Sequence, residues 1–295
     1  MNTIKRLIFL LSINFCAAQS INGVVKDSLT GEAIAYANIL LKNGKGTYSD
    51  ELGSFKLKVK NVHTDTLKVS TIGYQSKLIP VNVFKNNLTY EVLLAPKTEG
   101  LDEILISSKK LKYGKKEILG EQRDGNQSVT SLIGYETAVL IENLKNKTGK
   151  VKRVYINLKN RKDAEYIATF NVKFYQFDSI ANAPGELLYN ENIYVQPKNK
   201  KYKLWINVED LGIPFTENGM CVGVEMVNIH GKVKKYAYFG PMYRYTFTED
   251  KTLQTWSNYH NSGWRRGAID YKNPKRTKVG FLNPMIGVEV EYLLE

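Results

Sequence analysis

The chain has 295 residues, 43% of them hydrophobic and 24% charged, and its formal net charge is +13. This length suggests one to three domains with room for buried cores. The lysines are spread along predicted strand edges and loops, so a solvated basic surface is favoured over a dedicated anion site. Beyond the N-terminus no apolar run has the length of a membrane-spanning helix, and we expect no transmembrane helix in the mature chain.

Residues 1–18 have the pattern of a secretory signal peptide. Lys5-Arg6 forms a positive segment, Leu7–Phe15 an apolar segment, and Ala17-Ala18 a small-residue cleavage zone before Gln19. We therefore predict an exported protein that is periplasmic, associated with the outer membrane or displayed on the cell surface. Loss of this segment lowers the formal charge to +11.

The two cysteines have different expected roles. Cys16 lies inside the signal, and Phe15 stands where a lipoprotein signal carries a small residue, which argues against lipidation but leaves it open. Cys221 lies in the apolar run Met220–Val227. We expect it to be a small buried hydrophobic residue, and a single cysteine cannot form a disulfide within a monomer.

Short apolar runs separated by turns fill residues 19–96. In residues 55–59, Phe55, Leu57 and Val59 alternate with two lysines, which is typical of a half-buried strand. Such strands without helical periodicity predict an all-β sandwich. The predicted strands are Gly23–Val25, Ile34–Leu41, Phe55–Val59, Thr66–Ile72, Ser76–Val83 and Leu88–Leu94.

The order of the turn and strand motifs in this region resembles the carboxypeptidase regulatory-like domain. The motifs are Gly23-x-Val25-x-Asp27, Thr30-Gly31-Glu32, Ala37-Asn38-Ile39, Gly46-Thr47, Asp50-x-x-Gly53-x-Phe55, Leu67-x-Val69-Ser70 and Ile72-Gly73-Tyr74. The resemblance implies a seven-stranded, transthyretin-like Greek-key sandwich over residues 19–96, in an exported protein of Bacteroidetes. It also relates the segment to the N-termini of TonB-dependent receptors. It implies no peptidase activity, because this family is the accessory domain of the carboxypeptidases.

A glycine-rich and lysine-rich segment, residues 97–128, is the predicted linker, and residues 129–295 form the second predicted domain. In its clearest strand, Tyr166–Phe177, Ala168, Phe170, Val172 and Phe174 occupy one side, and Thr169, Asn171 and Lys173 the other. Long alternating strands with Pro/Gly-rich loops predict a jelly-roll-like β-sandwich. The other predicted strands are Tyr135–Glu142, Val151–Leu158, Asn192–Val195, Tyr202–Val208, Met220–Val227 and Gly287–Leu293.

Parts of this second domain resemble a C-terminal β-domain of exported flavobacterial proteins whose function is uncharacterised. The matching segments are Thr169–Asp178, Pro184-Gly185-Glu186, Trp205–Val208, Gly212-Ile213-Pro214-Phe215 and Gly219–Met226. This resemblance supplies no site residues.

The sequence contains no recognisable catalytic, metal or cofactor motif. His63, His230 and His260 have no neighbours at metal-ligand spacing, and each is expected on the surface or in a turn. The chain has no G-x-S-x-G elbow and no phosphate-binding glycine pattern. Glu289 and Glu291 share one strand face, as acids on exposed strands commonly do. We predict no catalytic residue, no bound metal and no cofactor. A structural calcium site built from loop acids stays an open alternative.

Aromatic side chains are concentrated in residues 236–271, among several arginines. Aromatic faces beside guanidinium groups suit sugar rings or peptides, although we expect about half of these rings to fill the core. The residues that we predict could contact a ligand are Trp256, Trp264, Tyr259 and Arg265.

Three hypotheses follow from these observations. The first is a non-catalytic exported envelope protein that acts as a binding or assembly module. The second is a carbohydrate-binding accessory protein that uses the aromatic loops, and the third, least favoured, is a hydrolase. The expected partner is an envelope protein or a glycan rather than nucleic acid, and the sequence does not give the oligomeric state.

Overall fold

The computed structural model describes residues 19–59, 65–84, 88–97, 111–125, 127–130, 132–227, 233, 237–248, 254–266 and 281–294. The predicted signal peptide, His63, His230 and residues 98–110 lie outside the described residues. Within them the chain is all-β, as predicted, and its two helical segments are single 3-10 turns, Val81–Val83 and Glu209–Leu211. No helix in the described part is long and apolar enough to cross a membrane.

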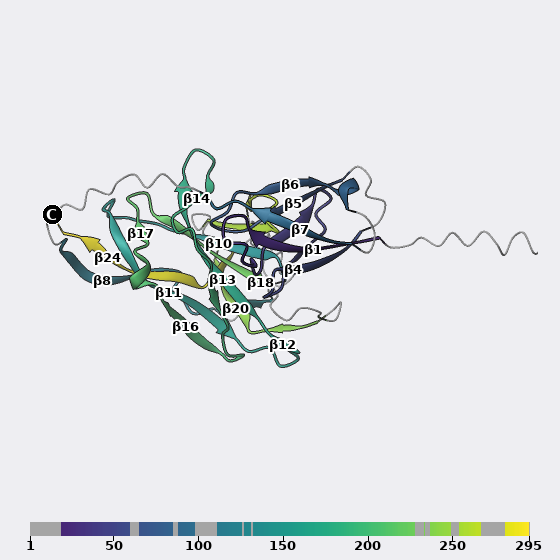
Figure 1. Ribbon diagram of the computed structural model, residues 1–295. Coiled ribbons are helices and arrows are strands. Elements are labelled where there is room, and N and C mark those ends of the chain that lie inside the picture. Colours follow the sequence, from purple (N-terminus) through teal and green to yellow (C-terminus); the bar gives the residue numbers. More distant parts are fainter. Residues whose placement is uncertain are drawn as a thin grey trace, which may run out of the picture.

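The N-terminal part is a sandwich of seven strands in two sheets, the number that the family resemblance implied (Figure 1). The strand Gly46–Tyr48 is not among the six predicted from the residue pattern. One sheet has the order β4 (Ser54–Val59), β1 (Gln19–Asp27), β7 (Thr89–Leu94). The other has the order β3 (Gly46–Tyr48), β2 (Asn38–Leu41), β5 (Thr66–Ser70), β6 (Lys77–Pro80). Phe55, Leu57 and Val59 are buried and the lysines between them are exposed, as the alternation predicted.

The predicted strand Ile34–Leu41 is shorter than expected. Only β2, Asn38–Leu41, is extended, because the backbone of Tyr36 has a φ of 56° and the chain turns there. A positive φ at a bulky residue is uncommon, and the sequence carries no signal for it. Tyr36 lies in this turn, before β2, and its ring contacts Tyr194 of the second domain.

The C-terminal part is a second two-sheet sandwich. Its first sheet has the order β14 (Ala183–Leu187), β13 (Thr169–Asp178), β18 (Met220–Val227), β10 (Tyr135–Ile141), β21 (Thr255–Tyr259), β22 (Arg265–Arg266), with β15 (Ile193–Val195) also paired to β13. Its core between the sheets contains Phe170, Val172 and Phe174. The buried Cys221 confirms the expected role of that residue.

The second sheet of this sandwich has the order β23 (Phe281–Pro284), β20 (Met242–Thr248), β11 (Gly149–Lys159), β24 (Ile286–Leu293), β8 (Tyr113–Gly120). Three further strands join it: β16 (Tyr202–Asn207) and β17 (Pro214–Phe215) on β11, and β9 (Gln127–Val129) on β20. A separate parallel pair consists of β12 (Tyr166–Ile167) and β19 (Phe239–Gly240).

Two sequence predictions differ from this arrangement. Residues 113–120 and the first two residues of the strand Gln127–Val129 fall in the predicted linker, yet they belong to strands of the second sandwich. Strand β8 is an edge strand whose charged side chains have partners in the sandwich, such as Lys116 beside Glu289 at 3.4 Å, so it lacks the apolar alternation that marks a strand in sequence. The predicted strand Tyr166–Phe177 is divided at Ala168 into β12 and β13, which pair with different strands.

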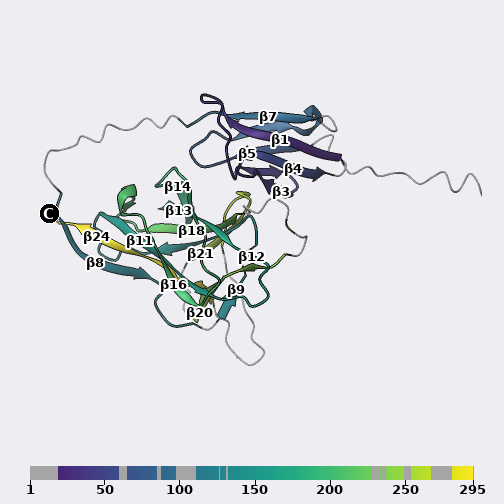
Figure 2. The same ribbon diagram turned by 60° about the horizontal axis from the view of Figure 1, so that its bottom comes forward.

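The β14–β13–β18 layer of the second sandwich faces the first sandwich, and the layer with β8, β24, β11 and β16 lies beyond it (Figure 2). The part of this sheet's outer face around Glu225 is therefore covered by another domain, whereas the part around Cys221 is covered by side chains of the second sandwich such as Leu187 and Trp264. This cover decides the chemistry of the side chains on that face.

Candidate functional site

Four polar residues form a row across the outer face of the β13 sheet. The strand register pairs Asn171 of β13 with Glu225 of β18, Glu225 with Glu136 of β10, and Glu136 with Asn258 of β21. All four are buried. Two carboxylates directly opposite each other destabilise a sheet unless another group compensates them.

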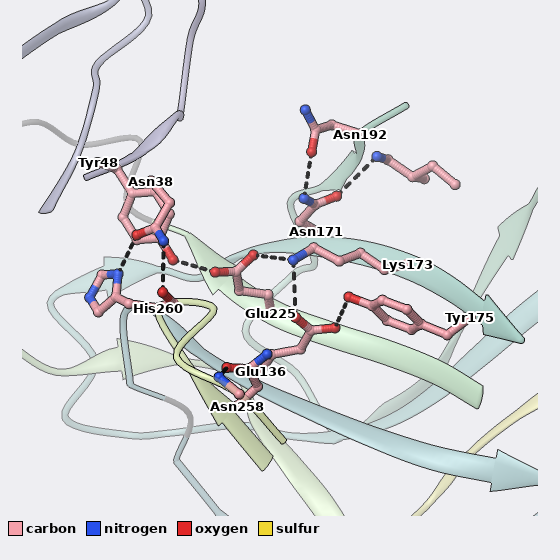
Figure 3. Close-up of polar contacts among 12 residues, drawn as sticks. Asn38, Tyr48, Glu136, Asn171, Lys173, Tyr175, Asn192, Glu225, Asn258 and His260 are labelled. Carbon is pink, nitrogen blue, oxygen red and sulfur yellow. Dashed lines mark hydrogen bonds and ion pairs between the residues drawn. The ribbon is translucent and has the colours of Figure 1, made fainter. Parts of the chain in front are cut away.

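Lys173 supplies that compensation from the next outward position of β13. Its Nζ lies 2.7 Å from Glu225 Oε2 and 3.0 Å from Glu136 Oε2 (Figure 3). The hydroxyl of Tyr175 donates to Glu136 Oε1 at 2.8 Å. Lys173 lies opposite Gly223 in the neighbouring strand. A Cβ at position 223 would lie 2.1 Å from Glu136 Oε1, so the absence of a side chain there makes room for the Glu136 carboxylate.

Burial and the neighbouring charges shift the pKa values of Glu136, Glu225 and Lys173. Burial raises the pKa of Glu136 and outweighs the attraction of Lys173. Burial also acts to raise the pKa of Glu225, but the charge of Lys173 and hydrogen bonds from Lys173 and Tyr48 hold it below its usual value. The two glutamates outweigh desolvation at Lys173 and raise its pKa well above the usual value. Burial therefore favours the protonated form of Glu136, and the contacts with Lys173 and Tyr48 favour the ionised form of Glu225.

The first sandwich donates two side chains to this cluster. The hydroxyl of Tyr48 on β3 donates to the Glu225 carboxylate. Asn38 on β2 donates from Nδ2 to the backbone oxygen of His260 at 2.8 Å, and its Oδ1 lies 2.7 Å from His260 Nδ1. Because an amide oxygen only accepts, the imidazole donates from Nδ1. Burial lowers the pKa of His260, which favours the neutral ring.

We call this set the junction network: Asn38, Tyr48, Glu136, Lys173, Tyr175, Glu225 and His260. Two further contacts accompany it. The rings of Tyr36 and Tyr194 meet edge to face with centroids 5.0 Å apart. Gly73, with a φ of 79°, approaches Asn190 so closely that a Cβ would lie 3.0 Å from its backbone oxygen.

Two hollows open beside the junction network. The inner cavity, of about 150 Å³, lies between the sandwiches and is lined from one side by residues such as Tyr36 and Asn38 and from the other by Asn171, Asn192 and Glu225. The second hollow, which we call the Trp264 groove, has a volume of about 340 Å³. Its lining residues are Lys97, Tyr175, Gly185, Glu186, Leu187, Asn190, Asn261 and Trp264.

The structure brings only one of the four sequence-predicted ligand residues into these hollows. Trp264 lines the groove and meets Tyr175 edge to face, with centroids 5.3 Å apart. Trp256 is 2% exposed and donates from its indole nitrogen to the backbone oxygen of Asn182 at 3.0 Å. Tyr259 is 41% exposed and packs against His260. Arg265 is exposed on β22.

The sequence motifs do not predict the junction network. His260, expected on the surface or in a turn, lies in a turn but is buried. Glu225 lies within β18, against Lys173. One available signal was Gly223 inside an apolar strand, since such a glycine often marks close approach of another group.

The paired acids that the sequence analysis considered are each engaged by basic side chains. Glu289 accepts hydrogen bonds from Arg153, which hold its pKa below the usual value. Glu291 lies 3.5 Å from Lys152. Among the described residues, no group of three or more His, Cys, Asp or Glu side chains is arranged to hold a metal ion.

Comparison with known proteins identifies the first domain. Residues 21–106 match the family model of the CarboxypepD_reg-like domain. The TonB-dependent receptor SusC of Bacteroides thetaiotaomicron is 40% identical over 98 residues, which are 32% of this chain and 9% of that receptor. The N-terminal part of the chain is therefore a CarboxypepD_reg-like domain, as its motifs predicted, and the chain covers only a small part of that relative's length.

Two solved structures from Bacteroides uniformis are similar over most of their length. One is a proposed carbohydrate-binding protein, with 10% identity, a TM-score of 0.23, and coverage of 90% of this chain and 97% of that chain. The other is a DUF3823 family protein, with 11% identity, a TM-score of 0.22, and coverage of 91% and 98%. At these TM-scores neither structure bears on the function of this chain.

Proposed function

We propose that this protein is a non-catalytic exported envelope protein, in which two β-sandwiches are joined into one binding or assembly module. The observation that carries this proposal is the junction network. Its charged groups are engaged with one another: Lys173 contacts both glutamates, and a tyrosine hydroxyl donates to each of them. A catalytic acid or nucleophile instead needs a reacting atom within hydrogen-bonding reach. Here the groups hold two domains together.

The receptor relative supports the envelope location. The matched residues of SusC belong to a TonB-dependent receptor. A shared domain is consistent with a shared cell compartment, and the predicted signal peptide of residues 1–18 agrees with export.

Two experiments test this function. The protein, carrying an affinity tag, is isolated from the envelope fraction of its native cells, and we expect a defined envelope protein or glycan to accompany it in constant proportion. Recovery of the protein alone from the cytoplasm would oppose the proposal. In the second experiment, a panel of peptidase and glycosidase substrates is expected to show no turnover. Turnover that is abolished by Glu136→Gln or Glu225→Gln would make the junction network an active site.

A second candidate function, carbohydrate binding, is favoured by one specific observation. Trp264, one of the residues selected from sequence, lines a groove together with two asparagine amides, a carboxylate and an ammonium group. An aromatic side chain with a few polar groups around it is a suitable arrangement for a sugar ring.

A further inference from the structure

The inner cavity and the Trp264 groove adjoin one another. They share four lining residues, Lys97, Tyr175, Leu187 and Asn261. Lys97 belongs to the first sandwich side and the other three to the second. A ligand that entered the groove could therefore extend into the space between the sandwiches without crossing a packed core.

The lining of the inner cavity is rich in hydroxyl and amide groups. These come from Tyr36, Asn38, Ser70, Thr71, Tyr74, Ser76, Asn171 and Asn192. Such groups both donate and accept hydrogen bonds. Two ammonium groups, Lys97 and Lys173, and two carboxylates, Glu186 and Glu225, line the two hollows, and Lys173 is matched by Glu225 at 2.7 Å. Four of the hydroxyl and amide groups already bond within the protein: Tyr36 to Glu51, Tyr74 to Asp27, Asn38 to His260 and Asn171 to Asn192. The hydroxyls of Ser70, Thr71 and Ser76 are left for a ligand. Because the positive and negative charges of the lining balance, an ionic ligand would lose its hydration and gain little compensation, whereas a neutral hydroxylated ligand can bond to these groups.

The groove adds an aromatic surface. Trp264 is half-buried and held by its edge-to-face contact with Tyr175. Its loop is fixed by Asn258, whose Oδ1 accepts from the backbone nitrogen of Gly263 at 3.2 Å. A pyranose ring has an apolar C–H face that packs on an indole and a polar rim that bonds to amides and carboxylates. Asn190, Asn261 and Glu186 supply the polar groups.

We propose that the junction binds the end of a neutral saccharide chain, with the terminal sugar in the inner cavity and the next ring against Trp264. The inner cavity, at about 150 Å³, is the smaller of the two spaces, which favours recognition of a chain end over the middle of a polymer. This inference rests on the proposed binding function and names its ligand class.

The test is titration calorimetry and tryptophan fluorescence on the full chain. The probes are neutral trisaccharides with glucose, galactose, mannose or xylose at the non-reducing end, with trigalacturonic acid as the anionic comparison. We expect at least one neutral trisaccharide to bind with a Kd of about 1 mM or tighter and to change the fluorescence. Failure of all four to bind, or stronger binding of the acid, would overturn the inference.

Variants locate the site. Trp264→Ala should weaken binding about tenfold, the loss expected for one aromatic contact. Trp205→Ala is the matched control, because Trp205 lies on β16 of the other sheet, against Tyr155 and Arg153, and its loss should leave the Kd unchanged. Asn192 lines the inner cavity, so Asn192→Ala should also weaken binding of the same trisaccharide. If the Trp264→Ala variant does not fold, Trp264→Leu is used in its place. Equal affinity of the folded variant and the wild type for the trisaccharide would refute the assignment of Trp264 to the binding site.

The same samples separate this inference from the broader proposal. Chromatography of the trisaccharide after incubation should recover it intact. Binding without cleavage supports both statements. Absence of binding removes the saccharide inference but leaves the envelope pull-down as the test of the module, whereas cleavage products would contradict the non-catalytic function.

Discussion

Tyr48 is the side chain through which the first sandwich reaches the charged groups of the second. Its hydroxyl donates to Glu225, and burial, followed by the charge of Glu225, raises its pKa well above the usual value. The hydroxyl is therefore protonated at every physiological pH and is a permanent donor. A hydrogen bond to a buried charged acceptor contributes more than one between neutral groups.

Removal of this single oxygen should destabilise the protein. Tyr48→Phe leaves the buried Glu225 carboxylate with one donor fewer, and we expect the free energy of unfolding to fall by about 2 kcal/mol in urea denaturation. Tyr36→Phe is the control, since the Tyr36 hydroxyl donates to Glu51 at the surface and its ring contact with Tyr194 is kept. That change should cost less than about 0.5 kcal/mol. Equal losses in the two variants would mean that the Tyr48 contact has no special role.

The protonation of Glu136 gives a pH dependence of known sign. Its pKa is usually 4.5, and burial raises it in the folded protein. At a pH between the usual pKa and the raised pKa, Glu136 keeps its proton in the native state but has lost it in the unfolded chain. The contribution of Glu136 to the free energy of unfolding therefore falls as the pH rises through this range.

Comparison with Glu136→Gln isolates this contribution. The free energy of unfolding of wild type minus that of the variant should decrease as the pH rises from 4.5. The slope should be at most about 1.4 kcal/mol per pH unit. Urea denaturation at a series of pH values measures it. A difference that is constant or increases with pH would show that Glu136 is ionised in the folded state.

At the scale of the element, strand β13 shows what the sequence could and could not predict. Its alternation correctly placed Phe170, Val172 and Phe174 in the core between the sheets. The same alternation indicates a solvated opposite face, but Asn171 is buried and Lys173 is bonded to two carboxylates. The alternation shows which side chains share a face of the sheet, but it does not show what packs against the polar face.

Strand β18 carries the glycine that makes room for this network. Gly223→Ala places a methyl group at the position of the Glu136 carboxylate and against the Tyr175 ring. Overpacking of this kind costs about 1–3 kcal/mol, and we expect a loss of stability in that range by thermal or urea unfolding. The control is Gly114→Ala on the edge strand β8, where the nearest atom is a leucine methyl 3.4 Å away. Tolerance of both alanines would contradict the packing described at Gly223.

At the scale of the whole molecule, the motifs of the first domain predict its family and, through that resemblance, its seven strands, whereas the residue pattern alone located six. Turn glycines and alternating strands are local features: Gly53 lies in the turn before β4, and Phe55 lies in β4 itself. The junction could not be predicted in this way. Asn38 and His260 are 222 residues apart, and nothing local in either segment indicates that they meet.

The junction also explains why Glu225 and His260 can be buried on the outer side of the second sandwich. Each buried polar group needs a partner. Glu225 has Lys173 from its own domain and Tyr48 from the other, and His260 is bonded to Asn38 of the other domain. The two sandwiches should therefore behave as one body, with the inner cavity and the Trp264 groove between them.

A double-mutant cycle on the free energy of unfolding tests this account most directly. It uses wild type, Tyr48→Phe, Glu225→Gln and the double variant, all measured by urea denaturation. If the two side chains bond across the junction, their effects will be non-additive by about 1–2 kcal/mol. Additivity within about 0.3 kcal/mol would mean that the two sandwiches do not meet through these residues, and the joined binding module would have to be abandoned.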